Sequence, residues 1–233
     1  GDHRELHSFP TRRSSDLGDA QNSYNVVVAS NDARLDGFTV SFGNSLDLAS
    51  TDPMDLPYHS GAGLFAKDIS NLTVENCRFF GNGSRHQGGA MYFDNADVSV
   101  RWTRVYGNFA PYAGGAMVKN GSVVTFDDCY VHDNMTFHFS NPYYYGGAMM
   151  VTGAGTNATI LNSQFVNNKA EHAMYGAGGA LYLNDNATVL IEDCAFAGNH
   201  CNGNNRYAGG GALSYSNLAS LTVRRSIFTG NPS

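Results

Sequence analysis

Two short motifs alternate along the chain, and this repeat restricts the folds that the sequence can adopt. The first is Gly-Gly-Ala followed by Leu or Met, found at residues 88–91, 114–117, 146–149, 178–181 and 210–213, with a Gly-Ala-Gly-Leu variant at 61–64. Successive copies are 27, 26, 32, 32 and 32 residues apart. The second is an apolar residue three positions before an asparagine, found at residues 79–82, 105–108, 131–134, 165–168, 196–199 and 228–231. Periods of this length are typical of solenoids and other repeat architectures.

Each repeat also contains short alternating runs of apolar and polar residues that predict β-strands. Examples are Val98–Val100, Val123–Phe126 and Val189–Ile191, which are rich in β-branched and aromatic residues and bounded by Gly and Asn. We expect three short strands per repeat: at the Gly-Gly-Ala motif, at the valine run and at the Phe-x-x-Asn motif. Parallel strands that recur without an intervening helix must climb by about one strand spacing per turn. The sequence therefore predicts an all-β parallel β-helix of about seven coils.

Composition agrees with this fold and excludes several classes of protein. Charged residues make up only 15% of the 233 positions, whereas apolar residues make up 42%. No apolar run approaches the roughly 18 residues of a membrane-spanning helix, so we expect no transmembrane helix. The net charge of -6 argues against a nucleic-acid partner.

Residues 1–17 stand apart from the repeat, because residues 7–17 resemble one reading frame of a sequencing-adapter oligonucleotide. We interpret residues 1–17 as an artefact outside the fold. Residues 18–233 are then expected to form an incomplete β-helix without its terminal caps, whose partners at both ends are the remaining coils of its own solenoid.

Three rows of small or polar side chains are expected at the corners of the coils. Five residues before each motif asparagine lies Cys, Ser or Thr, which suggests an inward-facing row: Cys77, Thr103, Cys129, Ser163, Cys194 and Ser226. Cysteines two coils apart lie about 10 Å from each other, too far for a disulfide. No Cys-x-x-Cys spacing supports zinc either, so we predict structural thiols and no metal site. Cys201 is placed in a loop.

The second row lies one residue earlier and contains Asn76, Asp128, Asn162 and Asp193, with Trp102 and Arg225 as departures. Asn and Asp tolerate the left-handed backbone that a tight corner requires. The motif asparagines are expected to form the third row at the next corner. We interpret these asparagines as structural and not catalytic.

The alternation of Gly-Gly-Ala-Leu/Met with Phe-x-x-Asn resembles the repeat of the chlamydial polymorphic membrane proteins and related bacterial right-handed β-helix proteins. The resemblance covers roughly residues 61–231, and residues 26–44 resemble the lead-in coil of such proteins. It implies a right-handed solenoid, secretion to the cell surface as in an autotransporter passenger region, and an adhesive or structural role.

Two files of side chains are predicted to fill the core. One comprises the residues that follow Gly-Gly-Ala, namely Leu64, Met91, Met117, Met149, Leu181 and Leu213. The other comprises the apolar residues of the second motif, namely Phe79, Val105, Val131, Phe165, Phe196 and Phe228. Because side chains alternate along a strand, the next residues should point outward as a partly aromatic stripe: Phe65, Tyr92, Val118, Met150, Tyr182 and Ser214.

This stripe is the predicted binding surface. It follows segments of unequal length, which we call the variable segments: 45–60, 83–87, 109–113, 135–145, 169–177 and 200–209. They bring Tyr and His residues to one side of the solenoid, and loops on a rigid scaffold often carry binding residues. The candidate binding residues are Tyr92, Tyr182, Tyr143, Tyr144, Tyr145, Tyr175, Tyr207, His86, His138 and His172. An exposed groove would accept a host or neighbouring-cell surface protein or an extended glycan. Alternatively, the segments fold down and seal the stripe as a second core, in which case burial of Tyr92 and Tyr182 would exclude the groove.

Catalysis is the other function class considered, because polysaccharide lyases and hydrolases occur on this architecture. A lyase would need carboxylates for Ca²⁺ and a basic residue on neighbouring coils, and the chain has only Lys67, Lys119 and Lys169 as lysines. No acid is expected in the coils next to Lys119. A hydrolase would need two carboxylates facing one cleft, whereas Asp94 and Asp185 are expected three coils apart. We therefore expect a non-catalytic surface module without cofactors, and a pectate-lyase-like, polysaccharide-processing enzyme is the alternative.

Overall fold

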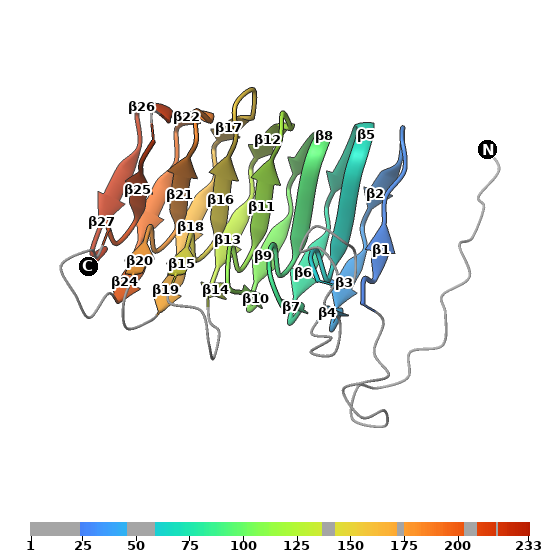
Figure 1. Ribbon diagram of the computed structural model, residues 1–233, viewed down its shortest axis with the longest axis horizontal. Coiled ribbons are helices and arrows are strands. Elements are labelled where there is room, and N and C mark those ends of the chain that lie inside the picture. Colours follow the sequence, from blue (N-terminus) through green and yellow to red (C-terminus); the bar gives the residue numbers. More distant parts are fainter. Residues whose placement is uncertain (1–23, 46–58, 137–142, 172–174, 203–208, 218) are drawn as a thin grey trace.

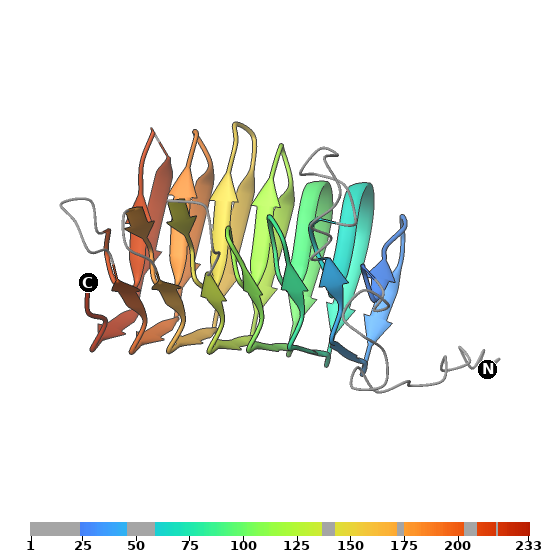
Figure 2. The same ribbon diagram turned by 60° about the horizontal axis from the view of Figure 1, so that its bottom comes forward.

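The computed structural model describes residues 24–45, 59–136, 143–171, 175–202, 209–217 and 219–233, which form short parallel strands wound into a solenoid (Figure 1). No helix occurs among these residues. Figure 2 shows the same coils turned by 60°, stacked one beside the next. The predicted all-β parallel β-helix is confirmed. The adapter-like residues 1–17 lie outside the described residues.

The largest sheet has 12 strands and contains the first and second strands of every coil. The first-strand positions are β1 (Val27–Val28), β5 (Leu64–Glu75), β8 (Met91–Arg101), β11 (Ala116–Lys119), β16 (Met149–Thr152), β21 (Leu181–Asn184) and β25 (Leu213–Tyr215). β5 and β8 are long enough to continue through the second position as well. The other second-position strands are β2 (Arg34–Asp36), β12 (Val123–Asp127), β17 (Asn157–Leu161), β22 (Thr188–Glu192) and β26 (Ser220–Arg224).

A seven-stranded sheet contains the strands of the Phe-x-x-Asn motif. These are β3 (Thr39–Ser41), β6 (Arg78–Phe80), β9 (Arg104–Tyr106), β13 (Tyr130–His132), β18 (Gln164–Val166), β23 (Ala195–Ala197) and β27 (Ile227–Thr229).

A fourth short strand follows the motif asparagine, which the prediction of three strands per coil missed. These strands form a six-stranded sheet: β4 (Asn44–Ser45), β7 (Gly83–Ser84), β10 (Phe109–Ala110), β14 (Met135–Thr136), β19 (Lys169–Glu171) and β24 (His200–Asn202). They lie where the sequence suggested irregular segments. The backbone there still needs hydrogen-bond partners, and the neighbouring coil supplies them.

The second core file is confirmed. Phe79, Val105, Val131, Phe165 and Phe196 pair in register on successive strands and are fully buried. Rings on adjacent coils stack, with 4.9 Å between the centroids of Phe165 and Phe196. Phe228 continues this file in the last described coil, where it is 44% exposed.

The first core file is correct in most coils but wrong by one residue in one of them. Ala116, not Met117, pairs with Met91 and Met149 and points into the main core. Ala113 accordingly has a φ of 58°, the left-handed conformation that Gly88 has one coil earlier with a φ of 61°. In this coil the Gly-Gly-Ala-Met motif is therefore shifted by one residue relative to the hydrogen-bond register of the strands. Met117 points outward, and Val118, which was expected outside, is buried in the main core.

The motif asparagines form a continuous hydrogen-bonded ladder. Asn134 Nδ2 donates to Asn168 Oδ1 at 3.0 Å and to the carbonyl oxygen of Val105 at 2.8 Å. The backbone N–H of Asn134 donates to the same Asn168 oxygen at 3.1 Å. The same pattern recurs down the row at Asn82, Asn108, Asn168 and Asn199. Because these buried side chains satisfy the backbone of adjacent coils, their structural role is confirmed.

The other two polar rows are also present at the expected corner. All six residues of the Asn/Asp row have a left-handed backbone, including the departures Trp102 (φ 48°) and Arg225 (φ 44°). In the inward-facing row, the backbone N–H of Cys129 donates to Ser163 Oγ at 3.0 Å. The four cysteines are free and buried, and burial raises the pKa of the Cys129 thiol to about 12. Cys201 lies on β24 and not in a loop, because its segment pairs in register with β19.

The glycines of the repeated motif are required by close approach between coils. A Cβ atom on Gly147 would overlap the carbonyl oxygen of Gly179 and the backbone of Lys169 on the neighbouring coil. We expect Gly147→Ala to lower the free energy of unfolding by about 1–3 kcal/mol, the usual cost of overpacking. Denaturant unfolding monitored by circular dichroism measures this loss. Gly107→Ala measures a different cost, that of a left-handed backbone, because Gly107 has a φ of 61° and no atom within 4 Å of an added Cβ, whereas Gly147 has no left-handed φ. An unchanged free energy of unfolding in Gly147→Ala would contradict the packing argument.

Candidate functional site

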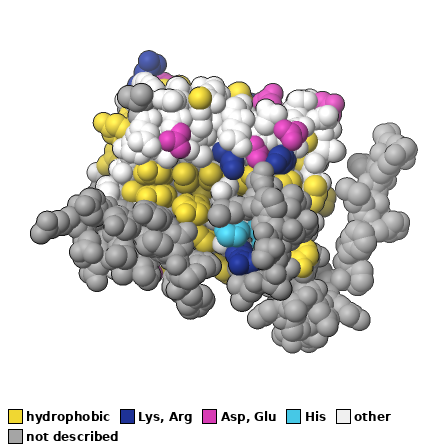
Figure 3. Space-filling model, viewed as in Figure 1, with side chains coloured by type: hydrophobic (Ala, Val, Ile, Leu, Met, Phe, Trp, Pro, Cys, Tyr) yellow, Lys and Arg dark blue, Asp and Glu magenta, His cyan; other side chains and the backbone are white. Residues whose placement is uncertain are grey.

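The outward face of the first strands carries a second hydrophobic cluster and not an exposed groove. Its buried members are Phe65, Tyr92, Ala113, Met117, Met150, Ala177 and Tyr182. Tyr92 is 0% exposed and Tyr182 is 8% exposed, so the predicted groove along these two residues is wrong. The rings of Phe65 and Tyr92 stack at 5.1 Å. In Figure 3, hydrophobic side chains form a strip across this face, with both basic and acidic side chains along its border.

The variable segments cover this cluster because they continue the parallel pairing of the coils. Isolated bridges join Ser60 to Gln87, Gln87 to Tyr112, and Tyr112 to Tyr145. Further along, β15 (Tyr143–Tyr145) pairs in parallel with β20 (Tyr175–Ala177). The Tyr145 ring stacks on Tyr182 at 4.3 Å and lies 6.1 Å from that of Tyr112. The segments thus form one more ladder, attached to the solenoid by aromatic packing.

The ten predicted binding residues do not form a single site. Tyr92, Tyr182 and Tyr145 meet in the second hydrophobic cluster. The half-buried His86 lies beside the buried His59, with 5.2 Å between the ring centroids. The backbones of Tyr143 and Tyr144 lie in β15 and that of Tyr175 in β20. Tyr207, His138 and His172 lie outside the described residues.

A polar row that the sequence interpretation missed borders the cluster. Lys67, Asp94 and Lys119 occupy the same position on three successive coils, so the expectation of no acid beside Lys119 was wrong. The nearly buried carboxylate of Asp94 lies 3.7 Å from Lys67 Nζ and accepts hydrogen bonds from the Tyr92 hydroxyl at 2.9 Å and Asn120 Nδ2 at 2.7 Å. The one-residue displacement at Ala116 concealed this row. Aligning Ala116 with Met91 would have revealed it.

Lys119 connects this row to a variable segment. Its Nζ donates to Gln87 Oε1 at 3.5 Å and lies 5.7 Å from the centroid of the Tyr92 ring. The Lys119 side chain therefore reaches from the sheet to the segment that follows β7, and its ammonium group lies over the Tyr92 ring of the aromatic cluster. The row thus carries two lysines and one carboxylate in a chain whose net charge is -6.

The family model for the right-handed β-helix region matches residues 20–233. The chain belongs to the right-handed β-helix family. The expected handedness is thereby established, whereas the resemblance to the chlamydial proteins remains an interpretation. No curated protein and no solved structure matches this β-helix.

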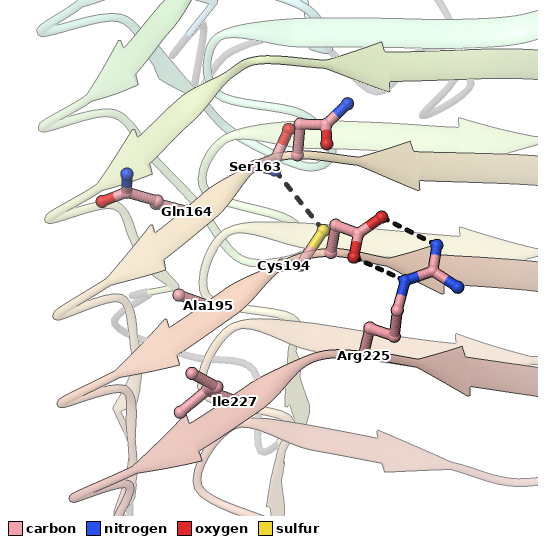
Figure 4. A pocket seen from close by; sticks show the side chains of 8 residues that line it. Ser163, Gln164, Cys194, Ala195, Arg225 and Ile227 are labelled. Atoms are coloured by element: carbon pink, nitrogen blue, oxygen red, sulfur yellow. Dashed lines mark hydrogen bonds and ion pairs between the residues drawn. The ribbon is translucent and has the colours of Figure 1, made fainter.

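The corner of the β-helix next to the seven-stranded sheet contains a small hollow of about 300 Å³ (Figure 4). Asn162, Gln164, Asp193, Cys194, Arg225 and Ile227 contribute to its lining. Arg225 Nε donates to Asp193 Oδ1 at 2.8 Å, Nη2 donates to Asp193 Oδ2 at 2.9 Å, and Arg225 also contacts Glu192. The hydrogen bond from Arg225 lowers the pKa of Asp193. Arg225 thus pairs with two carboxylates of the preceding coil.

Within the part of the chain that the structure describes, no helix is long and apolar enough to cross a membrane. Over the same residues, no group of three or more His, Cys, Asp and Glu side chains is arranged to hold a metal ion.

Proposed function

We propose that the chain is a secreted or cell-surface β-helix module that binds a partner without catalysis. The observation that carries this proposal is the attachment of the variable segments. Segments of different length are held in register by parallel bridges and packed onto a common aromatic cluster. A rigid scaffold that presents variable segments along one side is the usual arrangement of a recognition surface. The partner would be a protein or an extended glycan of a host or neighbouring cell.

The contact surface in this proposal is the outside of the variable segments and not the buried stripe beneath them. Arg85 and His86 are half-buried there, and Lys119 reaches the same segment at Gln87. These groups donate hydrogen bonds and carry or can acquire positive charge. They suit a partner that offers carboxylate, phosphate or carbonyl oxygens.

A segment exchange within the chain tests this function. In the coil of β10, one residue, Pro111, separates Ala110 from Tyr112, whereas residues 137–144 occupy the corresponding place between Thr136 and Tyr145. Replacing residues 137–144 by a single proline keeps the Tyr145 contact but removes the insertion. We expect a folded variant with a modestly lower melting temperature, because the pairing of Tyr143 and Tyr144 with β20 is lost. Binding to intact bacterial cells, cultured epithelial cells or an immobilised glycan panel should be lost.

The matched control shortens the opposite side of the same coil. Residues 153–156 become Asn-Gly-Ser, the sequence at residues 120–122 one coil earlier. This variant should bind as the parent does. The proposal is wrong if the parent binds none of these probes, or if the exchange of residues 137–144 leaves binding intact.

The polar row Lys67, Asp94 and Lys119 supports a second candidate, a polysaccharide-processing β-helix enzyme. It places one carboxylate between two amines on adjacent coils, and the Tyr92 hydroxyl donates a hydrogen bond to that carboxylate. Against it, the oxygens of Asp94 are engaged by three neighbours and its side chain is only 4% exposed. Incubation with polygalacturonate and other glycans should release no reducing ends. Product formation that Asp94→Asn abolishes would favour the enzyme instead.

A further inference from the structure

Trp102 occupies a corner position where more than half of its side chain is exposed. The corresponding residues of other coils include Asn76, Asp128 and Asn162, and all of them have a left-handed backbone. Trp102 has the same conformation, with a φ of 48°, and its side chain is 54% exposed. A bulky residue is disfavoured in this conformation, whereas Asn and Asp tolerate it. Strained residues of this kind concentrate at functional sites. An exposed tryptophan in a disfavoured backbone therefore suggests a role outside folding.

Two arginines lie next to this corner without neutralising partners. Arg78 and Arg104 pair in register on β6 and β9, and Tyr130 follows in the same row on β13. Adjacent strands are about 4.8 Å apart, so two positive side chains emerge next to each other. Both are exposed, and among the residues that the structure describes neither forms an ion pair. By contrast, Arg34 pairs with Glu75 and Arg225 pairs with Asp193. Like charges directly opposite on neighbouring strands are unfavourable unless an anion joins them.

A stack of aromatic side chains lies two residues further along the same strands, on the same outward face. The rings of Phe80 and Tyr106 stack at 5.3 Å, and those of Tyr106 and His132 stack at 4.9 Å. The Tyr130 ring lies 4.2 Å from His132, whose Nδ1 contacts Asp133 Oδ2 at 2.7 Å. The ring faces are therefore largely used within the stack. Within this stack, few ring faces remain open for sugar rings.

We propose that Trp102, Arg78, Arg104 and Tyr130 form a docking surface for an acidic, extended segment of a partner protein. Tryptophan, tyrosine and arginine are the residue types that dominate the energetics of protein–protein interfaces. Guanidinium groups bind carboxylates through paired hydrogen bonds, which fits Asp or Glu side chains of the partner. A protein partner is favoured over an acidic glycan because exposed tryptophan and tyrosine beside arginine are the residue types enriched at protein–protein interfaces. This surface is separate from the variable segments, so it does not depend on the function proposed above.

Fluorescence anisotropy of a fluorescein-labelled, glutamate-rich 12-residue peptide tests the proposal, with a glutamine-rich peptide as the neutral control. The labelled acidic peptide should bind saturably at low salt, and added salt should weaken the binding. Saturation should also change the fluorescence of Trp102, which is the only tryptophan of the chain. The double variant Arg78→Gln/Arg104→Gln should raise Kd at least tenfold. The charge-matched control Lys169→Gln/Arg224→Gln removes two exposed positive charges elsewhere and should leave Kd within twofold.

Trp102→Asn separates binding from folding, because asparagine is the residue that other coils use at this corner. It should keep or raise the melting temperature and raise Kd at least fivefold. The proposal is overturned if the control double variant loses as much affinity as the arginine variant, or if Trp102→Asn binds normally. It is also overturned if labelled polygalacturonate binds this surface while the acidic peptide does not, or if neither probe binds.

Discussion

Asn168→Ala is expected to lower the free energy of unfolding by about 3–5 kcal/mol, because it leaves several buried polar groups without partners at about 1–3 kcal/mol each. The Asn168 Oδ1 atom accepts from the backbone N–H and the Nδ2 of Asn134, and its own Nδ2 donates to the carbonyl oxygen of Val131. Alanine can replace none of these contacts, and water has no access to the buried row. Urea unfolding followed by far-UV circular dichroism measures the loss.

Two further variants of the same ladder establish the cause. Asn231→Ala, at the last described position of the ladder, should cost less, because its side-chain contacts are only partly buried. Asn168→Asp keeps an acceptor for Asn134 but loses the donor to Val131 and buries a charge, so it should also destabilise strongly. If Asn168→Ala cost no more than Asn231→Ala, the ladder would contribute little to the stability of the solenoid.

Phe196→Ala is expected to cost about 3–5 kcal/mol, the usual range when a large buried ring is truncated and the site cannot collapse. Phe196 is 0% exposed and lies between Phe165 and Phe228, with ring centroids at 4.9 and 4.7 Å. Strands on both sides are held by hydrogen bonds at a fixed spacing, so the coils cannot move together to fill the cavity. Denaturant unfolding of the variant provides the measurement.

Two substitutions in the same file serve as controls. Phe228→Ala should cost clearly less, because that ring is already 44% exposed in the described structure. Phe196→Leu keeps most of the apolar volume and should cost less than the alanine variant. Equal losses at Phe196 and Phe228 would mean that burial in the stack does not determine the energy.

Most of the fold could be predicted from the repeat, because each motif carries its own physical requirement. A buried phenylalanine three residues before a ladder asparagine demands one strand facing the core and a corner with hydrogen-bonding side chains. When these requirements recur in phase, parallel stacking satisfies them all. The fourth short strand could not be predicted in the same way. Its second residue is small and buried in every coil, as at Ser84 and Thr136, but two or three residues are too few to show the alternation that marks a strand. The strand forms because the neighbouring coil offers backbone partners.

The binding surface was the part that sequence reasoning placed incorrectly. The alternation of side chains correctly put Tyr92 and Tyr182 on the outward face of their strands. Although both point away from the main core, they are buried in the second hydrophobic cluster. The variable segments cover that face, and no periodicity in those segments indicates it. The motif also gave the wrong inward-facing residue at Met117. The hydrogen-bond register of the strands, and not the position within the motif, decides which residue points inward.

The sequence by itself determined that this chain forms a parallel β-helix, with phenylalanine files inside and asparagine ladders at the corners. These features follow from local patterns, because each residue type meets the same environment in every coil. Only the tertiary structure decided which surfaces remain open and which charges meet. Lys67, Asp94 and Lys119 are brought together, Tyr92 is buried, and Arg78 and Arg104 are left without acids. Exposure and pairing depend on how segments from different coils pack against one another, and a one-residue displacement that is nearly invisible in the sequence changes those neighbours.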